Sequence, residues 1–265
     1  MKTNLPAIKE QRLVAALACR AGGSRLFGKP LQNLDQGITI LDHIIEEMKS
    51  TNEIDAIVLG ISEGIENQIF VDVAKHHEIS YILGDQKDVL KRLVQCGRHE
   101  AATDVFRITS ECPFTSWEML PEAWREHKKN NNDITVTEFL PEGLNFEIYS
   151  LAALVKSHQK GNDNERSEFC SAYARRCHDQ FKIQVIPCQK DWARLDIRLT
   201  VDNPEDLILC RAVYKNLKGT KPHIPTGAIL KFVDQHPELH KLVEPYVDMT
   251  PLWAHCQKEV HDHEK

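Results

Sequence analysis

The chain has 265 residues, enough for one large α/β domain with a substantial core, or for a domain with a small appendage. The net charge of −6 and the absence of a long Lys/Arg run argue against a nucleic-acid partner. No apolar stretch approaches the roughly 20 residues of a membrane span, and the N-terminal residues lack a signal-peptide core. We therefore expect a cytoplasmic protein with no membrane partner.

The first half of the chain alternates between strand-like and helix-like patterns. Continuous apolar runs predict buried strands, and apolar residues at helical spacing predict amphipathic helices. We expect strands over residues 12–19, 54–61, 79–83 and 104–109, and helices over 40–49, 65–76 and 88–101. This order indicates an α/β fold with a mostly parallel, doubly wound sheet, in which ligands bind beyond the carboxyl ends of the strands.

The second half is less regular. The turn signal Pro141-Glu142-Gly143 between two strand-like runs predicts a hairpin or a small excursion of the sheet. Pro204 begins a helix that Asp202 or Asn203 would cap. The other expected elements are helices over 117–129, 151–159 and 166–177, strands over 133–140, 144–149, 181–187 and 195–201, and short helical pieces after residue 220.

Eight cysteines are scattered along the chain, and none forms a Cys-x-x-Cys pair. Several lie inside apolar runs that predict strands or helices. This usage favours reduced core cysteines in a cytoplasmic protein over a disulfide framework or a structural zinc site.

The segment from Leu17 to Pro30 carries the strongest functional signal. It follows a predicted buried strand and combines adjacent glycines with the cations Arg20, Arg25 and Lys29. Glycines allow backbone N–H groups to approach an anion closely, and the cations neutralise phosphate charge. The segment is therefore typical of a loop that holds a polyphosphate.

Two alternatives remain for this loop. Gly23, four residues and Gly28-Lys29 match the start of a P-loop, but Pro30 stands where Ser or Thr would hold magnesium. The other alternative is a basic surface loop after an edge strand. The density of cations and glycines makes a phosphate-binding loop the favoured interpretation.

The run from Arg20 to Leu31, RAGGSRLFGKPL, resembles the opening signature of the cytidylyltransferases that activate sugar acids, especially their spore-coat-polysaccharide-type branch. In that family the loop wraps the triphosphate of CTP. The resemblance implies a nucleotide-diphospho-sugar transferase fold, similar to GT-A, and catalytic roles for Arg20, Arg25 and Lys29. It also implies nucleotide contacts for Ala18, Cys19, Gly22, Gly23 and Ser24.

Two later segments resemble the magnesium-binding motifs of the same family. The run from Arg107 to Phe114 is similar to R-I-T-G-D-C-P-L, with Glu111 in the place of the Asp. The run from Thr200 to Leu207 is similar to T-V-D-T-P-E-D-L and contains Asp202. The resemblance implies Mg²⁺ as cofactor and these two carboxylates as its ligands. An exposed turn residue at 111 and a helix N-cap at 202 are the simpler alternatives.

Three further segments are similar to the family in the same order along the chain. The segment 83–92 resembles the one near the nucleotide base and implies roles for Gly84, Asp85 and Arg92, and Arg107 is expected beside the nucleotide as well. The turn after Pro141 and the segment 165–173 resemble parts of the acceptor side. They imply acceptor contacts for Asn145, Glu147, Arg166 and Glu168, while Phe169 replaces a histidine of the family pattern.

The resemblance implies CMP transfer from CTP to a small anionic acceptor in the biosynthesis of surface polysaccharide or capsule precursors. The acceptor would be a sugar acid or a phosphorylated amino acid such as phosphoglutamine, on the way to a phosphoramidate. A nucleotidyltransferase domain over residues 1–220, a helical extension over 221–265 packed on it, and a homodimer are expected. Two alternatives stay open: a GT-A-like glycosyltransferase, for which an Asp-x-Asp motif is missing, and a non-catalytic nucleotide-binding module.

Overall fold

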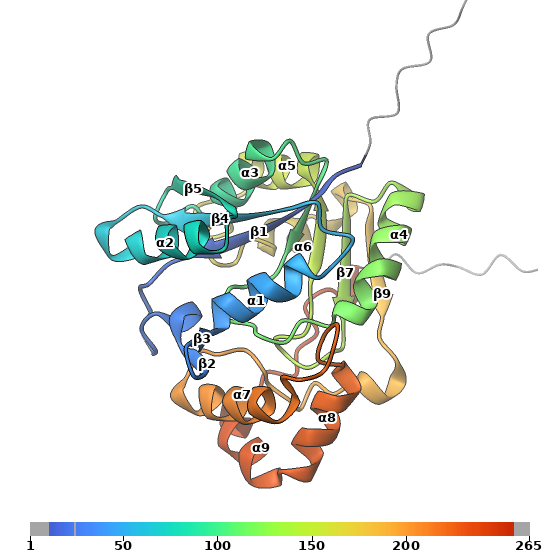
Figure 1. Cartoon of the computed structure of the whole chain (residues 1–265). Coiled ribbons are helices and arrows are strands. Elements are labelled where there is room, and N and C mark those ends of the chain that lie inside the picture. The colour runs from blue at the N-terminus through green and yellow to red at the C-terminus, as the bar shows by residue number, and fades with distance from the viewer. Residues whose placement is uncertain (1–10, 24, 257–265) are drawn as a thin grey trace, which may run out of the picture.

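The computed structural model describes residues 11–23 and 25–256, which form a seven-stranded sheet with helices on both faces (Figure 1). The strand order is β5-β4-β1-β6-β8-β7-β9. Its strands are β1 (Leu13–Cys19), β4 (Ala56–Ser62), β5 (Ser80–Gly84), β6 (Asp104–Arg107), β7 (Ile134–Glu138), β8 (Glu147–Ser150) and β9 (Ile183–Pro187). A separate two-stranded sheet contains β2 (Asn33–Asp35) and β3 (Ile38–Thr39).

The sheet is mostly parallel, as the sequence predicts. Strand β1 pairs in parallel with β4 and β6, β4 pairs in parallel with β5, and β7 pairs in parallel with β9. The predicted excursion is also present, because β8 runs antiparallel to both β6 and β7 and lies between them. The turn signal at 141–143 lies in the connection between β7 and β8, so this hairpin brings a long loop to the same edge as the carboxyl end of β6.

The helices are α1 (Ile40–Lys49), α2 (Gln68–His76), α3 (Val89–His99), α4 (Leu120–Asn130), α5 (Leu151–Lys160), α6 (Ala172–Arg176), α7 (Pro204–Leu217), α8 (Thr226–Gln235) and α9 (Pro237–Val243). They build two cores, one on each face of the sheet. Side chains of α1, α2, α4, α7 and α8 form the larger core, and those of α3, α5 and α6 form the smaller one. Strand β1 supplies Leu13, Ala15 and Leu17 to the first and Val14 and Ala16 to the second, as the two-residue period of a doubly buried strand requires.

Most predicted elements are confirmed to within a few residues. Helix α1 has the predicted bounds because Thr39 and Asp42 form a reciprocal capping box at its start. Asp88 caps α3 by accepting the backbone N–H of Lys91 at 2.8 Å. Asn203, and not Asp202, is the N-cap of α7.

Two predicted elements are wrong. The helix expected over 166–177 shrinks to α6, because Asn162 and Glu165 close a tight turn upstream through mutual hydrogen bonds of 2.9 and 3.1 Å. The strand expected over 195–201 forms a single bridge, between Glu142 and Arg198. It packs against the 141–143 turn and not against a strand: Gly143 has a φ of 97°, and a Cβ there would lie 2.6 Å from the backbone nitrogen of Thr200.

The chain after residue 220 crosses from one face of the sheet to the other. Ile229, Phe232 and Val233 of α8 lie in the larger core together with residues of α7, whereas Trp253 and Cys256 lie in the smaller core. All eight cysteines fall within the described ranges and are free thiols. No helix in the described ranges is long and apolar enough to cross a membrane.

Candidate active site

Two adjoining cavities open at the carboxyl ends of the strands. The loop cavity, about 340 Å³, is lined by the 20–30 loop, β6 and the start of α3. The hairpin cavity, about 420 Å³, is lined by the connection between β7 and β8, by α6 and by the C-terminal residues Leu252 and Trp253. Thr109, Glu111, Phe169 and Asp202 line both cavities, so the two form one continuous cleft.

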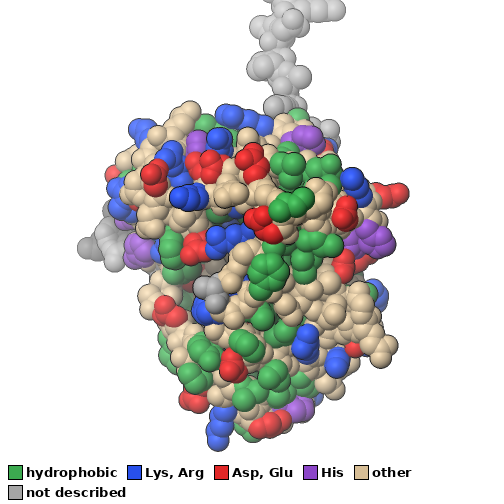
Figure 2. Space-filling view, turned by 90° about the vertical axis from the view of Figure 1, so that its left-hand side faces the viewer, with side chains coloured by type: hydrophobic (Ala, Val, Ile, Leu, Met, Phe, Trp, Pro, Cys, Tyr) green, Lys and Arg blue, Asp and Glu red, His purple; other side chains and the backbone are tan. Residues whose placement is uncertain are grey.

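The cations of the 20–30 loop lie around the loop cavity. In the space-filling view, basic side chains gather around a hollow near the middle of this face (Figure 2). The side chains of Arg20 and Arg25 are 52% and 54% exposed, whereas Lys29 is mostly buried at 19%. Gly28, with a φ of 58°, begins the short 3-10 helix Lys29–Leu31 that fixes the lysine. No α-helix follows this loop directly, so the loop does not have the strand–loop–helix form of a P-loop.

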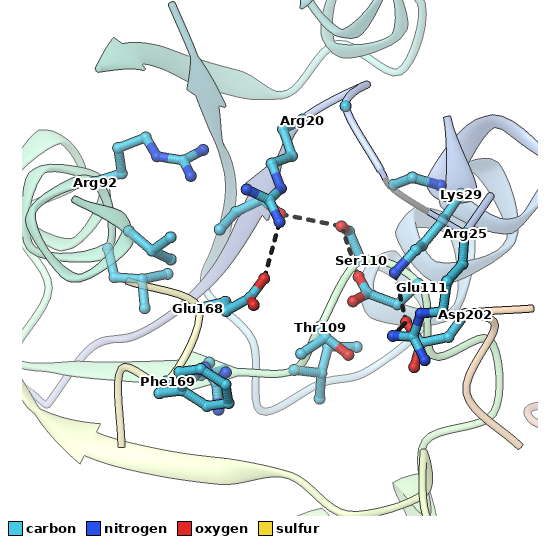
Figure 3. A pocket seen from close by; sticks show the side chains of 17 residues that line it. Arg20, Arg25, Lys29, Arg92, Thr109, Ser110, Glu111, Glu168, Phe169 and Asp202 are labelled. Atoms are coloured by element: carbon cyan, nitrogen blue, oxygen red, sulfur yellow. Dashed lines mark hydrogen bonds and ion pairs between the residues drawn. The ribbon is translucent and has the colours of Figure 1, made fainter. Parts of the chain in front are cut away.

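Lys29 and Arg25 converge on Asp202 (Figure 3). Lys29 Nζ lies 2.5 Å from Asp202 Oδ1, and Arg25 Nη2 lies 3.3 Å from the same oxygen. Burial alone would raise the pKa of Asp202, but the hydrogen bond and charge of Lys29, with Arg198 and Arg25, lower it below its ordinary value. Asp202 is therefore an ionised acceptor at neutral pH, surrounded by cations in the free protein.

Glu111 is the second carboxylate at this point of the cleft. Its backbone carbonyl accepts the N–H of Val201 at 3.0 Å, which ties the two carboxylate-bearing segments together. Ser110 Oγ bonds the carbonyl of Ala18 at 3.0 Å and lies 3.3 Å from Glu111 Oε2. Burial raises the pKa of Glu111, and Lys29 opposes that effect. Glu111 and Asp202 point into the same part of the loop cavity (Figure 3).

A buried arginine, Arg198, holds the oxygen of Asp202 that does not contact Lys29. The Arg198 guanidinium donates to Asp202 Oδ2 at 2.5 Å, to Asp206 Oδ1 at 3.1 Å, and to Glu142. Asp206 in turn accepts the backbone N–H groups of Asp202 and Asn203 at the start of α7. Because Arg198 holds one oxygen of Asp202, the other oxygen is directed toward Lys29 and the cavity.

The hairpin cavity is lined by carboxylates with fixed partners. Glu147 Oε2 accepts from Arg107 Nη1 at 2.6 Å, and its Oε1 accepts from the indole nitrogen of Trp253 at 3.0 Å. Asn145 lines the same cavity, and its Oδ1 is buried with no hydrogen-bond partner among the described residues. An unsatisfied buried acceptor in a polar cavity marks a position for a donor group of a ligand or for water.

Most residues expected at the nucleotide line the loop cavity. Ala18, Gly22, Arg92 and Arg107 do so together with the three loop cations, and Glu168 bonds Arg20 at 2.8 Å within the same cavity. Arg92 is almost fully buried and donates to the carbonyls of Cys19 and Gly60 at 3.1 and 2.7 Å. Ser24 lies outside the described residues.

Five residues expected at the site line neither of the two cavities in the described part of the chain. Arg166 pairs with Asp163 and lies 3.7 Å from Asp88, which turns its charge toward the start of α3. Asp85 accepts the backbone N–H groups of Lys87 and Asp88, so it shapes the turn before α3. Gly84 packs against the aliphatic part of Arg92, the side chain of Cys19 lies in the larger core, and Gly23 lies in a tight turn against the Leu26 carbonyl.

Some residues of the cleft are absent from the sequence-based expectation, among them Arg175, Leu252 and Trp253 of the hairpin cavity. Arg175 of α6 lines the hairpin cavity, and the only hydrogen bond of its guanidinium to the described residues goes to the hydroxyl of Ser171, at 3.3 Å. Leu252 and Trp253 reach the cavity from the C-terminal end of the chain. An Arg-Arg pair after Tyr173 and a tryptophan in a charged tail are the only local signals of their positions.

The cytidylyltransferase family profile matches residues 14–216. Uncharacterized protein MJ1063 of Methanocaldococcus jannaschii is 24% identical over 231 residues, covering 87% of this chain and 94% of that protein. The spore coat polysaccharide biosynthesis protein SpsF of Bacillus subtilis is 21% identical over 227 residues, covering 84% and 94%.

Solved structures share the fold. A cytidylyltransferase from Leptospira borgpetersenii superposes with a TM-score of 0.78 at 20% identity, covering 86% of this chain and 96% of that chain. A CMP:2-keto-3-deoxy-manno-octonic acid synthetase complexed with CTP superposes with a TM-score of 0.60 at 11% identity, covering 78% and 99%. Since the family profile covers most of the chain, including the loop, both carboxylates and the hairpin, this protein belongs to the cytidylyltransferase family.

Proposed function

We propose that this protein transfers CMP from CTP to a small anionic acceptor and releases pyrophosphate, with Mg²⁺ as cofactor. The observation that carries the proposal is the arrangement around Asp202, where two loop cations and a second carboxylate face one cavity. Family membership supports the nucleotidyl transfer, and a structural relative complexed with CTP supports the choice of nucleotide.

The triphosphate would bind where the loop cations converge. In the free protein Lys29 and Arg25 both pair with Asp202. Phosphate oxygens are better partners for these cations because they carry more charge and accept several hydrogen bonds at once. Binding of CTP would therefore draw Lys29 and Arg25 toward the phosphates and free one oxygen of Asp202, while Arg198 keeps the other in place.

Glu111 and Asp202 fit a magnesium site of the kind found in nucleotidyl transfer. Mg²⁺ takes oxygen ligands and is usually held by one or two carboxylates together with substrate phosphates and water. Among the described residues no group of three or more His, Cys, Asp or Glu side chains is arranged around one point, so the remaining ligands would come from CTP. The ion would neutralise charge on the phosphates during transfer.

The reaction requires an oxygen of the acceptor to attack the α-phosphorus of CTP in line with the departing pyrophosphate. The new bond joins that oxygen to the α-phosphorus, and the bond to the bridging α–β oxygen breaks, with its electron pair leaving on pyrophosphate. A phosphate oxygen attacks without losing a proton, whereas a sugar hydroxyl passes its proton to water. The protein contributes positioning and electrostatic stabilisation, and Arg20, Arg25 and Lys29 supply most of it.

The acceptor would lie in the hairpin cavity, next to the α-phosphate. Arg175 offers a guanidinium without an ion-pair partner among the described residues, which suits a phosphate or carboxylate of the acceptor. Asn145 and the fixed carboxylate of Glu147 would bind its hydroxyl or ammonium groups. We propose a sugar acid or a phosphorylated amino acid such as phosphoglutamine. The relative SpsF, by its name, favours a role in surface polysaccharide biosynthesis.

The experiment that tests this function measures pyrophosphate release by the purified protein with Mg²⁺. Each of the four nucleoside triphosphates is paired with sugar acids and with phosphoglutamine, and light scattering establishes whether the expected homodimer forms. Release with CTP and one acceptor class would support the proposal and identify that class. Binding of CTP without release in any pair would favour a non-catalytic module, and release of free sugar from a nucleotide sugar would favour a glycosyltransferase.

A further inference from the structure

The C-terminal strap, residues 247–256, closes one side of the hairpin cavity. It follows α9 and the 3-10 turn Glu244–Tyr246, lies beyond the residues matched by the family profile, and returns toward the strands (Figure 1). Trp253 is 2% exposed and lies in the smaller core, on the opposite face of the sheet from α8. The strap is therefore anchored to the main fold at its far end.

Glu138, at the end of β7, is the main attachment point of the strap. Its Oε1 accepts the backbone N–H of Leu252 at 3.3 Å, and its Oε2 accepts the backbone N–H of Trp253. A second attachment is made by the thiol of Cys256, which donates to the backbone carbonyl of Arg175 in α6 at a sulfur–oxygen distance of 3.8 Å. A buried carboxylate that accepts two backbone N–H groups is a strong and directional anchor.

The strap also determines the orientation of Glu147. The indole N–H of Trp253 holds Oε1 at 3.0 Å while Arg107 holds Oε2 at 2.6 Å. With one donor on each oxygen, the carboxylate has a single orientation in the cavity. Leu252, next to this tryptophan and 49% exposed, presents an apolar side chain to the same cavity.

We infer that the strap is the specificity wall of the acceptor site: Trp253 positions Glu147 for the acceptor, and Leu252 limits the size of the acceptor that fits. This inference rests on the proposed function, because the hairpin cavity is the acceptor site only if nucleotidyl transfer takes place. Trp253 acts through Glu147 and is a positioning residue. Its loss should affect the acceptor and leave the nucleotide, which lies at the other end of the cleft, unchanged.

Two substitutions test the functional part. Trp253→Phe keeps an aromatic ring in the core and removes the indole N–H, and Leu252→Ala widens the cavity. Trp192→Phe is the matched control, because Trp192 lines neither cavity in the described part of the chain. With phosphoglutamine and with 2-keto-3-deoxy-manno-octonic acid as probes, Trp253→Phe should raise the acceptor KM about tenfold with the CTP KM within twofold, the loss expected for one hydrogen bond to a charged group. Leu252→Ala should shift the preference toward the bulkier probe.

A labelling experiment tests the wall without requiring turnover. Cys112 lines the hairpin cavity and is 8% exposed, so its alkylation by iodoacetamide, followed by peptide mass spectrometry, reports access to that cavity. Glu138→Gln replaces one of the two carboxylate oxygens that accept the backbone N–H groups of the strap by an NH2 donor. This variant should accelerate labelling of Cys112 severalfold, whereas Trp192→Phe should not. Faster exchange of the Leu252 and Trp253 amides would show that the strap has been released.

The outcomes separate the two proposals. No pyrophosphate release by the wild-type protein in any pair contradicts the proposed function alone, while the labelling result still decides whether the strap covers the cavity. Unchanged Cys112 labelling in Glu138→Gln despite faster amide exchange would overturn the inference that the strap closes the hairpin cavity. Equal effects of Trp253→Phe on the KM values of acceptor and CTP would overturn the positioning role, because a general loss of structure would affect both substrates.

Discussion

The two cavities of the cleft are built in different ways. The loop cavity takes three of its cations from one run of residues directly after β1, and its other charged side chains come from later segments of the chain. The hairpin cavity takes its side chains from β7, β8, α6 and the C-terminal strap, and the bond between Trp253 and Glu147 spans 106 residues of sequence. The phosphate-binding loop is encoded locally, whereas the carboxylates that face it and the whole hairpin cavity come together only after the chain has folded.

The charged side chains of the two cavities also differ in how exposed they are. In the loop cavity, the side chains of Arg20 and Arg25 are more than half exposed, so an anion that enters the cavity can contact them. In the hairpin cavity, Glu142 and Glu147 are neutralised by Arg198 and Arg107 within the protein. The exposed loop cations can exchange their present carboxylate partners for the more highly charged triphosphate. The hairpin cavity instead combines paired glutamates with one guanidinium, that of Arg175, which has no ion-pair partner among the described residues and suits a small anionic acceptor.

The largest expected effect is in the loop cavity, on Lys29. Replacing it by Ala removes the buried cation nearest Asp202 and the triphosphate, so we expect kcat for pyrophosphate release to fall about a hundredfold or more. Lys87→Ala is the control, since this exposed lysine lines neither cavity in the described ranges. A Lys29→Ala enzyme with a near-normal rate would show that the loop does not hold the phosphates.

The sequence predicts the 20–30 loop of this cavity well because the signal is carried by residues close together in the chain. The glycines and cations of the 20–30 loop, the capping box of α1 and the alternation of strands and helices each depend on residues close together in the chain. Glu111 and Asp202 were expected as a pair from the resemblance to the family, and the backbone bond between the Glu111 carbonyl and Val201 explains how they meet.

The hairpin cavity is predicted less well because neighbouring residues do not determine it. The segment 195–201 has the apolar pattern of a strand, yet its partner is the 141–143 turn and it forms only one bridge. Arg175 and Arg176 are adjacent, but Glu165 binds Arg176 through two hydrogen bonds and leaves Arg175 for the cavity. From the sequence alone, Trp253 is interpreted as part of a charged tail, because its contact with Glu147 is visible only in the structure.

The second prediction concerns Glu111, where the two cavities meet. Glu111→Gln should raise the Mg²⁺ concentration for half-maximal pyrophosphate release about tenfold or more, because a neutral amide is a weaker ligand for this ion. Glu111→Asp should restore much of the affinity, since Asp stands at this place in the family pattern. Glu122→Gln, on the exposed face of α4, is the control. An unchanged Mg²⁺ requirement in Glu111→Gln would remove this residue from the metal site.

A smaller effect is expected at Arg175 in the hairpin cavity. Arg175→Ala should raise the acceptor KM about tenfold, the loss of one charge-assisted hydrogen bond, and leave the CTP KM unchanged. Arg125→Ala, on the solvent side of α4, serves as control. Steady-state kinetics with each substrate varied in turn measures both constants. If CTP binding weakens as much as acceptor binding, the division of the cleft into two functional halves is wrong.

The smallest effect distinguishes two carboxylates that hold the walls of the hairpin cavity. The hydrogen bond from Arg176 lowers the pKa of Glu165 below its ordinary value of 4.5, so the stability that Glu165 contributes is present above pH 4.5 and lost as the pH falls. Burial raises the pKa of Glu138 above 4.5, so its contribution is greatest below pH 4.5 and is lost as the pH rises through the folded-state pKa.

Thermal unfolding between pH 3.5 and 7.5 measures this difference in Glu165→Gln and Glu138→Gln. As the pH falls, the Tm advantage of the wild type over Glu165→Gln should shrink, and its advantage over Glu138→Gln should grow. Each change should be about 2 °C or less, because only one carboxyl group differs in each variant and 1 kcal/mol moves the Tm of a chain of this size by only about 2–4 °C. Parallel trends in the two variants would mean that the strap and the 162–171 segment are held by the same kind of contact. Opposite trends would show that acid loosens the segment carrying Glu168 while it leaves the strap attached.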